Sequence, residues 1–159
     1  MKRKGHDTLA IKGFLRLQIV DKKTRKVIGD TGLRPNQITN YGKNSCFLAA
    51  VVGAAGSVQI LGAMLGNGTN PASNATALDT PNTDYFAAVA TAINGSTQLQ
   101  FTASFDGTLG AATLANMGLF GATDYAATNS LICGKTFASS AVATTQDVNM
   151  TYNINYATA

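Results

Sequence analysis

The last segment of the chain alternates strictly between apolar and polar residues. Its apolar positions are Val148, Met150, Tyr152, Ile154 and Tyr156, and each position between them is Asn or Thr. Successive side chains of a β-strand point to opposite faces of a sheet, so this period of two predicts a strand with one buried face and one polar face. The buried face needs a second layer to cover it. The chain is therefore expected to be mainly β.

Other segments repeat this pattern along most of the chain. Residues 10–20 alternate, the polar residues 21–26 predict a turn, and a return strand begins at Val27. Further strands are predicted at 58–65, 98–105, 113–120 and 131–137, whereas 84–93 fits a strand or a short helix. Short strands separated by Gly, Asn and Asp turns favour an antiparallel β-sandwich over a βαβ fold. We expect residues 10–159 to form a single β-sandwich domain and residues 1–9 to form a basic N-terminal arm.

One helix is predicted near residues 38–53. The residues that recur at the spacing of a helix face are Ile38, Tyr41, Ser45, Leu48, Ala49 and Val52. Either Asn36 or Thr39 could cap the start of this helix, because both side chains can accept a hydrogen bond from a free backbone N–H. The stretch from Gly53 to Gly56 is expected to end it.

Charge is concentrated at one end of the sequence. The first 43 residues carry eleven of the twelve Lys and Arg residues and three Asp, a net charge of +8; the other residues carry one Lys and five Asp, a net charge of −4. Charged residues make up 13% of the chain, about half the usual ~25%. Soluble monomers use charge to stay apart. We therefore expect this nearly uncharged body to be covered in an assembly, as a homo-oligomer (a trimer or dimer) or against other proteins.

The basic end is expected to make the docking contacts. The residues predicted for this role are Lys2, Arg3, Lys4, Lys22, Lys23, Arg25 and Lys26. A positive arm and hairpin tip would steer the chain onto an acidic protein surface. Nucleic acid is the less favoured partner, because aromatic residues, apart from Phe14, do not interleave with the basic positions. The remaining alternative is a solvated basic face. A carbohydrate site is disfavoured, because the chain has no Trp and its last two Tyr residues fall on the expected core face.

Few residues could perform chemistry. General acid–base catalysis needs a tunable His or carboxylate in a site, but the single His, His6, lies in the predicted arm and the chain has no Glu. We expect no enzyme activity, no cofactor and no metal site. Cys46 and Cys133 sit among apolar residues without a metal-binding spacing, which predicts buried free thiols or, less favoured, one disulfide. No run of about 18 apolar residues occurs, so no membrane span is expected. Lys12 interrupts the first apolar stretch, so no secretory signal is expected either.

Three stretches along residues 10–156 form a set. They are Asn36-Gln-Ile-Thr-Asn-Tyr-Gly-Lys43; then Met64-Leu-Gly-Asn-Gly-Thr-Asn-Pro71 followed by Ala77-Leu-Asp-Thr80; then Phe101-Thr-Ala-Ser-Phe105 followed by Met117-Gly-Leu-Phe120. This order resembles small structural proteins of tailed bacteriophage virions. In such proteins an acidic residue usually precedes Gly-Leu-Phe, whereas Asn116 and Met117 stand there in this chain.

The resemblance implies a β-sandwich, often jelly-roll-like, that decorates a capsid or forms part of a tail or fibre. It carries no catalytic residues. The expected function is that of a non-enzymatic virion structural protein. A capsid decoration or cement protein, which binds the major capsid protein or other virion proteins and stabilises a phage head, is expected first. A tail, baseplate or fibre component is the alternative. The expected location is the virion, after assembly in the host cytoplasm.

Overall fold

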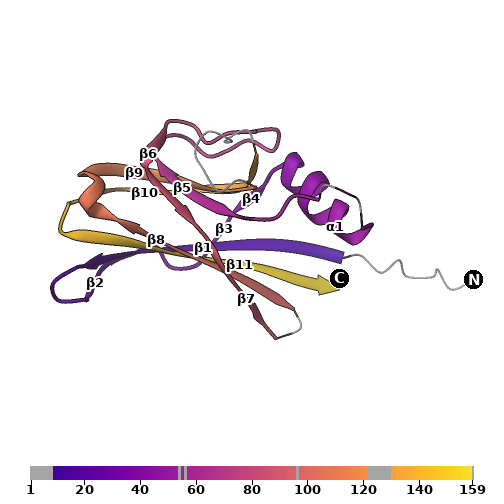
Figure 1. The fold of residues 1–159 in the computed structure, drawn as a ribbon, viewed down its shortest axis with the longest axis horizontal. Helices are drawn as coiled ribbons and strands as arrows, with labels where there is room; N and C mark the ends of the chain where they lie inside the picture. Colours follow the sequence, from indigo (N-terminus) through magenta and orange to yellow (C-terminus); the bar gives the residue numbers. More distant parts are fainter. Residues whose placement is uncertain (1–8, 54, 56, 96, 122–129, 159) are drawn as a thin grey trace, which may run out of the picture.

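The computed structural model describes residues 9–53, 55, 57–95, 97–121 and 130–158. In this part of the chain two antiparallel sheets lie face to face, and one helical segment lies at the end where the N-terminal strand begins (Figure 1). The predicted mainly β fold with two antiparallel layers and one helix is therefore confirmed. None of the helices in the described residues is long and apolar enough to cross a membrane.

Sheet A has the strand order β2-β1-β11-β8-β7, and β3 also pairs with β1. Its strands are β1 (Leu9–Asp21), β2 (Val27–Asp30), β3 (Arg34–Pro35), β7 (Ala90–Asn94), β8 (Gln98–Asp106) and β11 (Gln146–Thr158). Sheet B has the order β4-β10-β9-β5-β6. Its strands are β4 (Gln37–Ile38), β5 (Gly62–Gly66), β6 (Pro81–Ala88), β9 (Ala112–Phe120) and β10 (Leu131–Val142).

The alternating segments meet in register at the centre of sheet A. Tyr152 of β11 lies opposite Leu15 of β1 and Phe101 of β8. Because all three side chains are at most 5% exposed, the period of two places the apolar positions of neighbouring strands on one inward face. They pack in a single core with residues of sheet B such as Leu119 and Ile132.

Along the chain, connections that pass from one sheet to the other alternate with hairpins between neighbouring strands of the same sheet. The connections β8 to β9 and β10 to β11 pass from one sheet to the other, as jelly-roll connections do, whereas β5–β6, β7–β8 and β9–β10 are hairpins within a sheet. The segment predicted as strand or short helix forms the strands β6 and β7, which belong to different sheets. It therefore links the two layers.

The helix begins later than predicted and buries a different face. Its main part is a π-helix from Gly42 to Leu48, followed by the three-residue α1 (Ala49–Val51). The residues before Asn40 form β4 instead. Thr39 caps the helix, because its Oγ1 accepts a 3.0 Å hydrogen bond from the Gly42 N–H. A π-helix makes i→i+5 hydrogen bonds and so has more residues per turn than the α-helix assumed for the pattern.

That change of period explains which residues of the helix are buried. Cys46 and Phe47 point into the core, whereas the expected face residues Leu48 and Val52 are 57% and 75% exposed. Cys46 and Cys133 are both buried and free. This confirms the favoured prediction of two buried thiols rather than a disulfide.

The outer faces of the two sheets differ. A loop of residues 67–80 covers the outer face of sheet B, where Leu78 packs with Met64, Phe120 and Leu131 in a second apolar cluster. All five residues of β5 are consequently buried. Most side chains on the outer face of sheet A are instead exposed or half-buried. Sheet A is therefore the layer whose outer face another molecule could cover.

Candidate functional site

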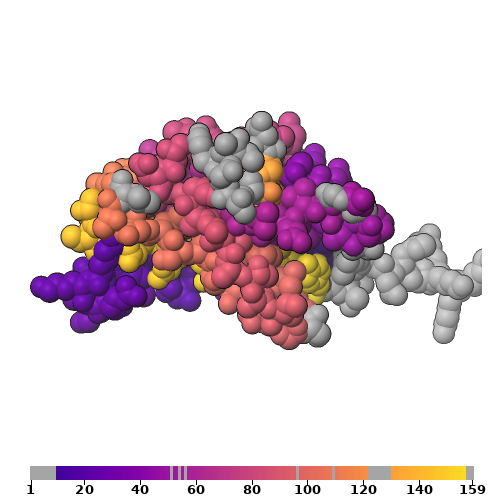
Figure 2. Space-filling view, viewed as in Figure 1, coloured from indigo at the N-terminus to yellow at the C-terminus, as the bar shows by residue number. Residues whose placement is uncertain are grey.

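The turn that joins β1 to β2 carries the four predicted docking residues that the structure describes. It projects at one end of the molecule (Figure 2, indigo). Lys23 and Lys26 are exposed, and neither has an acidic partner in the described part of the chain. Arg25 is 76% exposed in its side chain and lies 3.8 Å from a carboxylate oxygen of Asp147. These three side chains are accessible to a partner.

Lys22 has a different role from its neighbours. Its Nζ donates to a carboxylate oxygen of Asp106 and to the Thr144 carbonyl at 3.3 Å, and it lies 3.4 Å from Asp147. These contacts tie the β1–β2 turn to the end of β8 and to the β10–β11 turn. The hydrogen bond to Asp106 is also the main reason why the pKa of Lys22 is raised. Lys22 therefore holds the tip in place and is less free to dock than Lys23 or Lys26.

We expect the Lys22–Asp106 pair to make the fold sensitive to acid. The hydrogen bond from Lys22 lowers the pKa of Asp106 from 3.8 to about 2. A carboxyl whose pKa is lower in the folded chain stabilises the fold above its unfolded-state pKa, and that contribution is lost as the pH falls through the folded-state pKa. The melting temperature should therefore fall between pH 3.8 and about 2. Calorimetry should show a smaller fall for Asp106→Asn; an equal fall would mean that the pair contributes nothing.

Lys2, Arg3 and Lys4 lie outside the described residues. Their predicted role in docking is unchanged. The described chain places the start of β1 relative to the tip. β1 begins at Leu9, opposite the C-terminal end of β11, and it ends at Asp21 beside the tip. The thirteen-residue strand β1 thus lies between its own start at Leu9 and the tip. The start of the strand and the tip lie at opposite ends of sheet A (Figure 1).

The outer face of sheet A carries a ladder of uncharged polar side chains. We call it the amide ladder. Its members are Gln98, Gln100, Thr102 and Ser104 of β8 and Asn149, Thr151, Asn153 and Asn155 of β11. Side-chain hydrogen bonds of 2.9–3.1 Å join three of its four rungs, from Gln98 to Asn155, from Gln100 to Asn153 and from Ser104 to Asn149. The fourth rung places Thr102 opposite Thr151.

Another molecule could cover the amide ladder at small energetic cost. Burying an unpaired polar group or a charge costs several kcal/mol, but amides that already hydrogen-bond to each other lose fewer bonds to water. The sequence indicated the β11 side of this ladder through its alternating Asn and Thr residues. It did not indicate the partners on β8, because the pairing depends on the register of two strands that lie far apart in the chain.

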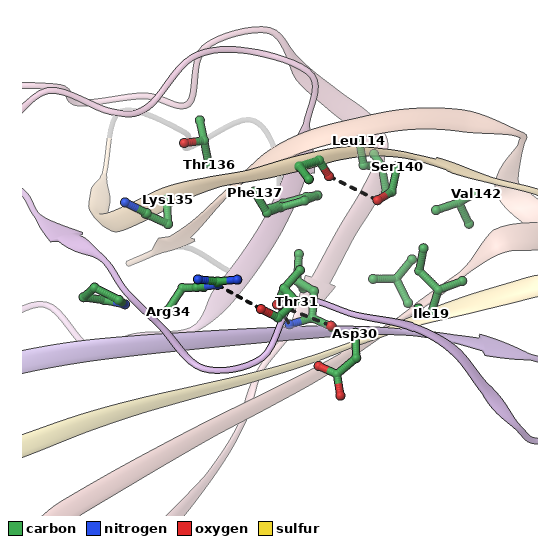
Figure 3. Close-up of a pocket in the computed structure, with 15 residues that line it drawn as sticks. Ile19, Asp30, Thr31, Arg34, Leu114, Lys135, Thr136, Phe137, Ser140 and Val142 are labelled. Atoms are coloured by element: carbon green, nitrogen blue, oxygen red, sulfur yellow. Dashed lines mark hydrogen bonds between the residues drawn. The ribbon is translucent and has the colours of Figure 1, made fainter.

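A groove opens along one side of the sandwich, between sheet A and β10 (Figure 3). It has a volume of about 610 Å³. Ile19 and Val148 line it from sheet A, and Phe137 and Val142 line it from β10. Arg34 lies at the groove and donates from its Nε to the Thr31 carbonyl at 3.0 Å. No sequence pattern predicts this groove, because its walls come from both sheets and no local pattern links them.

The stretches 64–71 and 77–80 are joined to Asn116 in a structural clamp. Asp79 Oδ2 accepts hydrogen bonds from the backbone N–H and the hydroxyl of Thr69, both at 2.8 Å. Asn116 Nδ2 donates to the carbonyls of Asp79 at 2.8 Å and Thr69 at 3.2 Å. A Cβ at Gly68 would lie only 2.3 Å from the Asp79 carbonyl oxygen. This clamp closes the loop that covers sheet B.

Comparisons of the chain with protein-family models, with curated proteins and with solved structures give no match.

Proposed function

We propose that this chain is a non-enzymatic structural protein of a bacteriophage virion, and that it decorates or cements a capsid by binding the major capsid protein. A decoration protein adds buried surface between shell subunits. It stabilises the closed shell because it binds that state better than the open one. The same surfaces would serve a tail, baseplate or fibre component, which is the alternative within this class.

The observation that supports this proposal best is the amide ladder. It is a neutral, regular face on β8 and β11, two central strands of sheet A, and the opposite outer face of the sandwich is already covered by the chain's own loop. A monomer that stays in solution gains little from such a face, since it uses charge to avoid association. The resemblance of the three sequence stretches, taken as a set, to virion proteins supports the same class.

The basic end supplies the second part of the proposal. We expect the arm and the exposed cations Lys23, Arg25 and Lys26 to orient the chain on an acidic capsid surface, while the neutral faces are covered. Attachment should then weaken as salt rises, because exposed charges are screened beyond ~10 Å at about 0.1 M salt. Imaging purified virions that carry a labelled copy of the chain would distinguish a head location from a tail location.

A sedimentation assay with purified virions or empty shells tests the electrostatic part. We expect the double variant Lys23→Ser/Lys26→Ser, and separately removal of residues 1–6, to reduce the retained protein roughly tenfold, since each lost exposed contact contributes up to about 1 kcal/mol. The melting temperature should not change, because the changed residues of the tip are exposed and unpaired. The matched control is Lys12→Ser/Lys43→Ser, which removes two exposed cations away from the tip.

Three outcomes would count against the proposal. Retention that ignores the variants and the salt would show that the basic end is only solvated. An equal loss of retained protein in the control variant would show that attachment depends on the total charge of the chain rather than on the cations of the tip. Preferential binding to nucleic acid over empty shells would favour the rival function of a nucleic-acid-binding β module.

A further inference from the structure

The edge strand β7 differs from the other sheet edges of the described chain. An exposed edge offers unpaired backbone N–H and C=O groups to any other strand, so natural sheets block their edges with charges, prolines, bulges or very short strands. β7 pairs on one side only, with β8, in unbroken register from Ala90 to Asn94. It contains neither a charge nor a proline, and all five of its residues are exposed.

Each of the other described edges carries at least one blocking feature. β2 contains Asp30 and shifts its register against β1. β3 and β4 have two residues each, and β3 contains Pro35. β6 starts with Pro81, contains Asp84 and shifts its register against β5. Beyond β4, the free side of β10 carries Lys135, and β10 has a register shift against β9. Within the described residues, β7 is therefore the edge left open to pairing.

An apolar side chain stands on this open edge. Ile93 is 76% exposed, although its register partner Leu99 packs against the core. Isoleucine favours a strand that is packed on its faces, and removing its side chain from water is favourable. A strand added beside β7 would cover part of Ile93 and satisfy the outward backbone groups at the same time. Figure 1 shows β7 at the margin of the molecule, where nothing of the described chain covers it.

We infer that β7 pairs antiparallel with β7 of a second copy of this chain, around a two-fold axis that joins two copies of sheet A into one sheet. In such a contact each group meets its own counterpart or a near neighbour, so any charge on the edge would face a like charge. β7 is uncharged, and so are Gln98, Gln100 and Thr102 beside it on β8. A partner of different sequence would not require this neutrality, because complementary charges could select it.

Joining two copies in this way also extends the amide ladder across the dimer, since β8 and β11 follow β7 in the sheet order. Five residues bury less than the ~1,200 Å² of a standard stable interface, so we expect weak association, with a Kd on the order of micromolar. Crowding of copies on a shared surface would strengthen it. The inference does not depend on where the chain attaches.

Light scattering coupled to size-exclusion chromatography of the full chain, at tens of micromolar, tests the pairing. The test variant is Thr91→Lys/Ile93→Lys, which puts two lysines on one face of β7. The control is Leu48→Lys/Val52→Lys, which adds the same charge at two exposed apolar positions, 57% and 75% exposed, on and just after the helix. We expect a dimer for the native chain and the control, and at least a roughly tenfold weaker dimer for the β7 variant, because like charges then meet across the axis.

Disulfide trapping identifies the contact directly. Single cysteines at Thr91, Ala92 and Ile93 sample the centre of β7, and the native Cys46 and Cys133 are buried. We expect mild oxidation to join two copies through the position on the axis, and Ser104→Cys on the exposed face of β8 to stay unjoined. A native monomer at these concentrations, a trimer, or a dimer that survives the β7 lysines and does not crosslink through β7 would each overturn the inference.

Discussion

Replacing Tyr152 with Asp is expected to destabilise the fold by about 4 kcal/mol or more. The Tyr152 ring is 1% exposed and packs against Phe101 with ring centroids 6.4 Å apart. Its hydroxyl accepts a hydrogen bond from Asn36 Nδ2. The change would leave a cavity and place a carboxylate among apolar side chains, where a charge without a partner is costly. Since domains of this size are stable by about 5–15 kcal/mol, the variant should lose a large part of its stability and unfold at a much lower urea concentration.

Asn149→Asp is the matched control for this prediction. Asn149 lies on the same strand but on the opposite, exposed face, and its Oδ1 accepts a 2.9 Å hydrogen bond from the Ser104 hydroxyl. An aspartate can accept the same bond, so we expect a change within about 0.5 kcal/mol. Urea unfolding followed by circular dichroism compares the two variants. If both unfolded at the same urea concentration, β11 would not bury the face that the alternation assigns to the core.

The sequence could predict the central strands because their burial is periodic. In β11 the period of two spans the whole buried segment, so each side chain shows which face it occupies. The same holds for β1, where Leu15 and Leu17 are buried and Arg16 and Gln18 are only half-buried. Strand pairing could not be predicted in this way. The neighbours of β11 are β1 and β8, and their registers arise from contacts between distant parts of the chain.

The helix lies within its predicted range but begins later than residue 38. Asn36 was one candidate cap, but the backbone after it continues into β4 and pairs with β10 at Gln37 and Ile38. The sequence offered one correct local signal, the cap at Thr39. The Thr39 hydroxyl also donates to the Leu131 and Ile132 carbonyls of β10. Those hydrogen bonds could not be predicted, since β10 is distant in the sequence. Tertiary packing decided both the start of the helix and its buried face.

The predicted docking residues of the β1–β2 turn differ in whether an acidic side chain lies beside them. Sequence alone placed Lys22, Lys23 and Lys26 in one turn, and the structure does the same. It separates Lys22 from the others only because Asp106 and Asp147, distant in the chain, reach the turn through the sheet. The open edge at β7 could not be predicted from the sequence either. The lack of charge in this short strand matters only because the strand lies at a sheet edge and the other described edges are blocked.

Replacing Gly42 with Ala is expected to cost about 1–2 kcal/mol, although alanine is the better helix former. In a helix interior, glycine is destabilising by about 0.5–1 kcal/mol relative to alanine. Here the added Cβ would lie 2.2 Å from the Ile132 carbonyl oxygen and 2.9 Å from its carbon. Those are backbone atoms of β10 and cannot rotate away. Steric overlap of this kind typically costs 1–3 kcal/mol or more, so it outweighs the gain in helix propensity.

Relief of that overlap would require the helix to move away from β10, and the contacts at the helix start oppose the movement. The Ile132 carbonyl accepts from the Thr39 N–H at 2.9 Å and from its hydroxyl at 3.0 Å. The same hydroxyl caps Gly42, so a shift would break the cap together with the attachment to β10. Asn44→Ala, on the exposed side of the same helix, is the control and should be neutral or slightly stabilising. Thermal unfolding of the two variants measures the difference. If Gly42→Ala melted at or above the native temperature, helix propensity rather than close packing against β10 would govern this position.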